Sequence, residues 1–187
     1  MFSRREQLIK KCGEGGVGRH DFLRQLIHEF TTTTSIERKR QTLANLANFA
    51  YDPINYEFMK QLHLVDLFLA QLSETNQELL RFALAGLCNI SCDPEIKEYI
   101  ISLKGINLIA SYVLHKNEEI ALNALTTLFY LFESKSAVFP EDLEQKVIQL
   151  EANSNPRLKN LGTVFLQAYY RNKNDKSGIQ NVSSNIV

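Results

Sequence analysis

Residues 43–53 of the chain read Leu-Ala-Asn-Leu-Ala-Asn-Phe-Ala-Tyr-Asp-Pro, and residues 84–94 read Leu-Ala-Gly-Leu-Cys-Asn-Ile-Ser-Cys-Asp-Pro. The two stretches align without a gap at a shift of 41 residues, from Leu43 to Leu84. Further pairs keep the same register: Leu62 and Leu103, Leu67 and Leu108, Asn76 and Asn117 and, one period later, Leu87 and Leu128. Self-similarity at a fixed period of this length predicts stacked structural repeats.

Within each period, apolar residues recur at three- and four-residue spacing, which predicts helices and, from their lengths, three helices per unit. The predicted short first helices span 53–62 and 94–103, and the second helices span 64–72 and 105–114. The predicted long third helices span 36–50, 77–91, 118–132 and 156–170. Their leucine ladder forms the predicted core: Leu43, Leu46, Leu84, Leu87, Leu125 and Leu128. The chain is therefore expected to be an all-α solenoid.

The array is expected to begin and end with incomplete units. A helix over 21–30 precedes the first long helix, and the third unit is shorter because Asn155 aligns with Asn117 only at a shift of 38. We therefore expect an abbreviated first helix around 136–139, with Pro140 opening the second helix. Terminal units of this kind present a polar outer face.

Capping residues stand in register before the predicted helices. Their side-chain oxygens can accept hydrogen bonds from the unpaired N–H groups of the first helical turn. These residues are Ser35, Asn76, Asn117 and Asn155 before the long helices, and Asp52 and Asp93, each followed by proline, before the short ones. Proline at the first helical position loses no hydrogen bond.

The two ends of the chain differ in composition from the repeats. Residues 1–20 contain the glycine-rich run 13–18, and residues 171–187 are polar and rich in Asn and Ser. Such segments bury too little apolar surface to order on their own. The predicted organisation is a flexible N-terminal arm (1–20), a repeat domain (21–170) and a disordered C-terminal tail (171–187).

The composition limits the classes of function. Lys plus Arg and Asp plus Glu both number 21, so no net charge draws the chain to nucleic acid or membrane. No apolar run approaches the roughly 20 residues that span a bilayer. The three cysteines, an odd number, favour a reducing compartment, the cytosol or the nucleus. Cys88 and Cys92 share a helix face and are interpreted as packing residues rather than a metal pair.

The 41-residue period with three helices and the string Ala-Leu-x-x-Leu-x-Asn resembles the armadillo repeat. The string occurs as Ala83-Leu84-Ala85-Gly86-Leu87-Cys88-Asn89, and the related run 43–53 continues into Asn55-Tyr56-Glu57. The resemblance covers about residues 17–170. It implies a right-handed superhelix whose long helices line a groove that binds an extended partner.

The resemblance also suggests which residues line the groove. The predicted partner-binding set is Arg40, Asn45, Asn48, Arg81, Asn89, Thr127 and Tyr130. Asn48 and Asn89 match the family's groove asparagine, whose amide can pair with both sides of a peptide bond. The alternative is that they bond neighbouring backbone within the solenoid. Arg40 and Arg81 could bind acidic side chains or phosphate, or form a solvated helix face.

By resemblance, we expect a nuclear protein, present also in the cytoplasm, that serves the minor spliceosome. Its expected partners are a protein with an RNA-recognition motif and other spliceosomal proteins, with RNA contacted indirectly. The alternative is a cytoplasmic adaptor for another extended peptide, unrelated to RNA. Nuclear-import adaptors of this superfamily carry groove tryptophans, and the chain has no Trp, so binding of nuclear-localisation signals is not expected.

Nothing in the sequence predicts an enzyme. The four histidines, His20, His28, His63 and His115, have no paired spacing typical of metal ligands. The glycines of 13–18 lack the lysine and the preceding strand of a phosphate-binding loop. We expect no catalytic residue, no cofactor, no metal and no small-molecule substrate.

Overall fold

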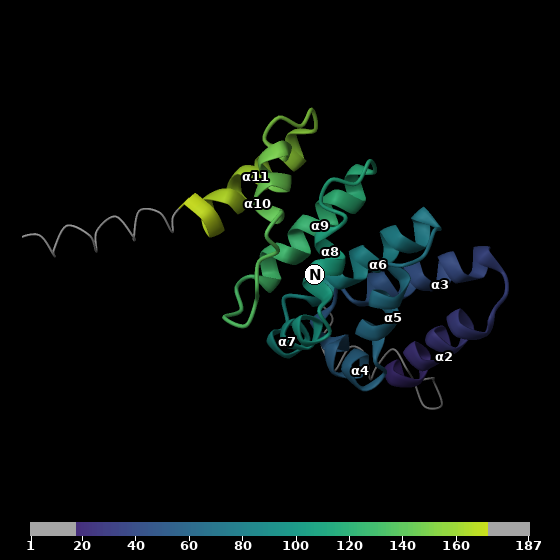
Figure 1. Ribbon diagram of the computed structural model, residues 1–187. Coiled ribbons are helices and arrows are strands. Elements are labelled where there is room, and N and C mark those ends of the chain that lie inside the picture. The colour runs from purple at the N-terminus through teal and green to yellow at the C-terminus, as the bar shows by residue number, and fades with distance from the viewer. Residues whose placement is uncertain (1–17, 172–187) are drawn as a thin grey trace, which may run out of the picture.

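The computed structural model describes residues 18–171, which form helices stacked side by side into an array running from α2 to α11 (Figure 1). Within that range no residue lies in a β-strand, as the sequence predicts. None of its helices is both long and apolar enough to cross a membrane. The predicted arms fall mostly on residues 1–17 and 172–187, outside the described residues. Arg19, His20 and Arg171, assigned to those arms by the sequence, are helical.

The predicted three-helix unit is present twice in full. The first helices are a 3₁₀ turn η1 (Pro53–Asn55) with α4 (Tyr56–Gln61), and α7 (Pro94–Ser102). The second helices are α2 (Arg19–Thr32), α5 (Leu64–Gln71), α8 (Gly105–Ala110) and α10 (Leu143–Leu150). The long third helices are α3 (Ile36–Phe49), α6 (Gln77–Ile90), α9 (Glu118–Leu131) and α11 (Pro156–Leu166), the last continuing as a π-helical turn, η2 (Gln167–Arg171).

The third unit differs from the prediction in its first helix. Residues 136–139 are not helical, and α10 begins at Leu143 rather than at Pro140. Pro140 lacks an N–H and disfavours helical backbone at the residue before it. The Pro140 carbonyl instead accepts a hydrogen bond from the Leu143 N–H at 3.1 Å, which makes a turn into α10.

The predicted caps all hold helix starts. Asn76 Oδ1 accepts from the N–H groups of Glu78 and Leu79 at 3.0 and 3.2 Å. The remaining caps, each accepting from at least one first-turn N–H, are Ser35, Asn117, Asn155, Asp52 and Asp93. These bonds fix where each helix begins and thus the register of the repeats.

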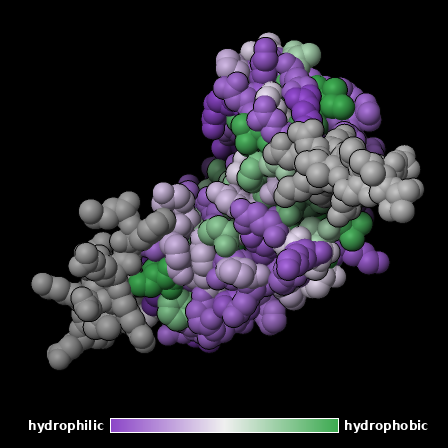
Figure 2. All heavy atoms as spheres, turned by 90° about the vertical axis from the view of Figure 1, so that its left-hand side faces the viewer, coloured by the Kyte–Doolittle hydropathy of each residue, from purple (hydrophilic) through white to green (hydrophobic). Residues whose placement is uncertain are grey.

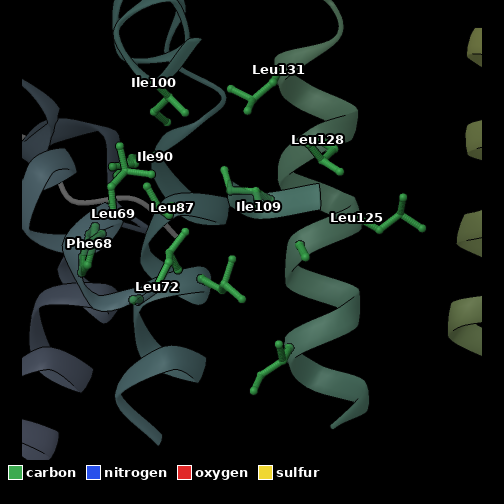
Figure 3. Close-up of a cluster of buried hydrophobic side chains, with 14 of the residues drawn as sticks. Phe68, Leu69, Leu72, Leu87, Ile90, Ile100, Ile109, Leu125, Leu128 and Leu131 are labelled. Carbon is green, nitrogen blue, oxygen red and sulfur yellow. The ribbon is translucent and has the colours of Figure 1, made fainter. Parts of the chain in front are cut away.

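One hydrophobic core runs through the array between neighbouring units (Figure 3). The six residues of the predicted leucine ladder are all 0% exposed. Phe68 of α5 is also 0% exposed, and it packs so closely on α6 that a Cβ at Gly86 would lie 2.4 Å from its Cζ atom. Glycine at 86 is therefore favoured by packing, since any side chain there would force the Phe68 ring or the helices to shift.

The C-terminal end of the array carries α10 and α11. Viewed from this end, most of the surface is hydrophilic, with small separate hydrophobic patches (Figure 2). Beneath it, the rings of Phe132, Phe139 and Phe165 lie 5.1 to 5.8 Å from that of Tyr169, and Phe139 stacks on Phe132 at 3.9 Å between ring centroids. The aromatic cluster closes the core, and the polar outer face matches that expected of a terminal unit.

Candidate protein-binding face

The exposed sides of α3, α6 and α9 form one continuous surface, here called the long-helix face. The helices pack in sequence order, and equivalent positions recur at the 41-residue step. One row along this face consists of Asn48, Asn89 and Tyr130, and another of Arg40, Arg81 and Leu122. The predicted partner-binding residues therefore come together from three helices, although they differ in how much surface they expose.

The two groove asparagines have different surroundings. Asn48 is exposed, so its amide can reach a partner. Asn89 is half-buried, and its Nδ2 donates to the Ala47 carbonyl at 2.9 Å, joining α6 to the end of α3. Asn45 Oδ1 accepts from Gln41 Nε2 at 3.2 Å within α3. For Asn89 the bond to neighbouring backbone, one of the two alternatives from the sequence, is present.

The two arginines are paired with the following unit. Arg40 forms ion pairs with Glu78 of α6 and, at 3.1 Å, with Glu37 of its own helix. One period later, Arg81 pairs with Glu119 of α9 at 2.9 Å. The arginines thus form a repeated bridge from each long helix to the next, which ends at Leu122. An acidic partner would have to compete with these glutamates.

Thr127 offers no surface to a partner. Its side chain is 0% exposed, and Oγ1 donates to the Asn123 carbonyl at 2.7 Å. The expectation that it lines the binding surface is therefore corrected, because it lies between α9 and the core. Tyr130 is half-buried, and burial raises the pKa of its hydroxyl, so it stays protonated and can donate a hydrogen bond.

Several contacts near this face were not predicted from the sequence. Lys97 is 8% exposed, and its Nζ lies 2.6 Å from the Glu133 carboxylate just after α9. Tyr56 donates from its hydroxyl to the Asn89 carbonyl at 2.9 Å and lies 3.1 Å from Cys92 Sγ. Burial is the main cause of a raised pKa of the Tyr56 hydroxyl. The only signal in the sequence was spacing: Lys97 and Glu133 are 36 residues apart, and Tyr56 and Asn89 are 33 apart, somewhat less than one repeat.

Residues 18–171 hold no group of three or more His, Cys, Asp or Glu side chains placed to bind a metal ion. Cys88 and Cys92 both lack a disulfide. Burial raises the pKa of the Cys88 thiol to about 11, which leaves it protonated and unreactive at neutral pH. The chemistry that this face offers is amide, aromatic and paired-charge contact with another macromolecule.

The chain is similar to curated and solved proteins, although no family model matches it. Armadillo repeat-containing protein 7 of Mus musculus is 52% identical over 157 residues, which cover 82% of this chain and 79% of the mouse protein. Identity at that level across most of both chains establishes a common family.

Three solved structures share the fold at low sequence identity. Computationally designed armadillo repeat proteins for modular peptide recognition superpose with a TM-score of 0.69 at 16% identity, covering 89% of this chain and 69% of the other. A designed armadillo repeat protein in complex with the peptide (KR)4 superposes with a TM-score of 0.53 at 13% identity, covering 88% of this chain and 90% of the other. An engineered protein superposes with a TM-score of 0.62 at 17% identity. The match covers 78% of this chain and 61% of the engineered one. The chain therefore belongs to the family of armadillo repeat-containing protein 7, and it is a right-handed α-solenoid.

Proposed function

We propose that this solenoid is a non-enzymatic, protein-binding scaffold of the minor spliceosome, which holds a protein with an RNA-recognition motif during splicing of U12-type introns. The protein is nuclear and is also present in the cytoplasm. The observation that supports this role is the match of most of the chain to armadillo repeat-containing protein 7. Contact with RNA is indirect in this proposal. The chain has 21 basic and 21 acidic residues, and Arg40 and Arg81 are bound to glutamates of this same chain.

The partner segment lies along the long-helix face. Asn48 is exposed, and the Tyr130 hydroxyl is protonated, so both can hydrogen-bond an extended backbone. Arg40, Asn45, Arg81 and Asn89 contribute mainly by holding the face in shape, because each is bonded within the solenoid. A neutral segment with apolar side chains fits such a surface better than a strongly charged one.

The test is a pull-down from nuclear extract with the tagged full chain. The binding variant combines Asn48→Ala with Tyr130→Ala, and the matched control is Ile148→Ala, since Ile148 is 40% exposed on α10. Far-UV circular dichroism verifies that each protein is folded. We expect the wild type and the control to recover an RNA-recognition-motif protein with minor-class small nuclear RNA, and the binding variant to lose both.

Other outcomes decide between alternatives. Equal recovery by all three proteins would keep the splicing role and move the contact away from the long-helix face. Recovery of neither the protein nor the RNA by the wild type, with a cytoplasmic location of the tagged chain, would favour an adaptor for a different extended peptide. Salt-dependent binding of the purified chain to RNA would show direct RNA contact instead.

A further inference from the structure

The third unit leaves a space where the other two units have a first helix. Residues 136–142, here called the strap, run past this space without forming a helix. A hollow of about 640 Å³ lies between the strap and the ends of α7 and α8. Its lining includes apolar side chains and two carboxylates: Ile101, Ile106, Val138, Phe139, Glu141 and Asp142.

The strap is held firmly in place, so the hollow is a fixed feature. The hydroxyls of Ser134 and Ser136 donate to the carboxylate of Glu98 on α7. The Phe139 ring stacks on Phe132 at 3.9 Å. Val138 lies between these anchors and is 77% exposed, the largest value for a large apolar side chain in the described part of the chain. An apolar residue held outward at a hollow indicates a docking surface.

The charge around the hollow indicates what it binds. Glu141 takes no part in any ion pair among residues 18–171, and Asp142 pairs with Lys146 at 2.7 Å. Glu144 follows one turn later, and Lys104 also lines the hollow. A lining of apolar side chains with two carboxylates and one lysine is complementary to an apolar side chain followed by basic ones.

The chain itself contains such a segment outside the described residues. It begins Met1-Phe2-Ser3-Arg4-Arg5, with one aromatic residue followed closely by two arginines. In the sequence, the glycine-rich residues 13–18 form the linker between this segment and α2.

The point where this linker joins the fold brings the segment within reach. His20, at the start of α2, packs edge-on against Phe58 of α4 at 6.1 Å. Helix α4 is joined to α7 by Lys60 and Glu95 at 2.6 Å, and Ile101 of α7 lines the hollow. Neighbouring helices lie about 10 Å apart, so the hollow is roughly 20 Å along this row. The 16 residue-to-residue steps from Phe2 to Gly18 can extend to about 50 Å.

We propose that residues 2–5 of the chain dock in this hollow. The Phe2 ring packs against Val138 and Phe139, and the Arg4 and Arg5 guanidinium groups bind the carboxylates of Glu141 and Asp142. The segment thereby covers the apolar surface that the missing first helix leaves open. This inference concerns the chain alone and does not depend on its splicing partner.

The test uses a tryptophan as a reporter of its surroundings, because the full chain contains none. In Phe2→Trp, docking predicts an emission maximum at shorter wavelength than that of an exposed indole, with several-fold weaker quenching by acrylamide. Adding Val138→Lys should restore emission and quenching typical of solvent, since a lysine there repels the arginines and removes the apolar contact. Val164→Lys is the matched control, because Val164 is 48% exposed on α11, away from the hollow.

A second variant keeps the test independent of any change to the solenoid. Arg4→Glu with Arg5→Glu lies wholly in the segment and should release the tryptophan as Val138→Lys does. Solvent-like emission from Phe2→Trp alone would overturn the proposal. If the tryptophan stays shielded when Val138→Lys is added, the segment docks elsewhere. If the shielding is lost on dilution, the hollow binds the segment of a second copy. Either result would also overturn the proposal.

Discussion

Replacing Gly86 with alanine tests the packing between α5 and α6 most directly. The added Cβ would lie 2.4, 2.5 and 2.7 Å from three atoms of the Phe68 ring, where carbon atoms normally approach to about 3.5–4.0 Å. The ring is 0% exposed and cannot turn out into solvent. The helices must therefore separate by about 1 Å, or the ring must leave its rotamer.

Two effects of opposite sign set the magnitude. Alanine is a better helix former than glycine by about 1 kcal/mol in a helix interior. Overpacking of a filled core costs about 1–3 kcal/mol, and three contacts this short place Gly86→Ala at the upper end. We expect a net loss of about 1–2 kcal/mol in the free energy of unfolding, or roughly 3–6 °C in Tm for a chain of this size.

The assay is urea and thermal unfolding followed by far-UV circular dichroism, with Gly162→Ala as the matched control. At Gly162 the nearest atom to an added Cβ is Leu150 Cβ at 3.1 Å, so Gly162→Ala should cost at least about 1 kcal/mol less. Phe68→Leu should partly rescue Gly86→Ala, making the double variant more stable than the sum of the single losses predicts. Increased stability of Gly86→Ala, or strict additivity with Phe68→Leu, would refute this account of the packing.

Three further predictions concern bonds between units and the cysteines. Asn89→Ala removes the hydrogen bond to the Ala47 carbonyl and should lower the free energy of unfolding by about 1–2 kcal/mol in urea titrations; an unchanged midpoint would contradict it. Glu133→Gln should lower the free energy of unfolding by about 1–2 kcal/mol more than Lys97→Met. Glutamine leaves the buried Lys97 ammonium without its charged partner, whereas methionine at 97 removes the buried charge. Equal urea midpoints for the two variants would argue against this. At pH 8, iodoacetamide should modify the exposed Cys92 well before Cys88, because burial raises the pKa of the Cys88 thiol to about 11. Peptide mapping by mass spectrometry would measure the two rates. Equal rates would mean that α6 opens easily.

The fold was predictable from the sequence because local signals and the repeat period agree. Asn76 and Asn117 cap helices one period apart, and Leu87 and Leu128 are buried one period apart. Each position was thus indicated both by its own chemistry and by its equivalent in the next unit. The third unit broke this agreement. Its step of 38 residues signalled a shortened first helix, but only the structure shows that residues 136–139 have none.

The candidate face was only partly predictable, since contacts between units set the role of each side chain. Asn48 and Asn89 occupy equivalent positions, yet only Asn89 has the end of a preceding long helix, α3, within hydrogen-bonding distance. The position of Thr127 in the third long helix predicted a surface residue, but its side chain is fully buried. Periodicity identifies the helix face on which a residue lies, but the position of the neighbouring helix decides whether the residue is exposed or bonded.

The pairing of charges between units also limits the kind of partner that this face can bind. Arg40 and Arg81 each bind a glutamate of the following long helix, so their charge holds the helices together and is not displayed outward. A polyanionic ligand such as RNA would have to break both pairs, and it would meet Glu78 and Glu119 as it did so. The exposed Asn48 and the half-buried Tyr130 are uncharged and can bind backbone without breaking any ion pair. The arrangement therefore favours a neutral protein segment over nucleic acid as the direct ligand of the long-helix face.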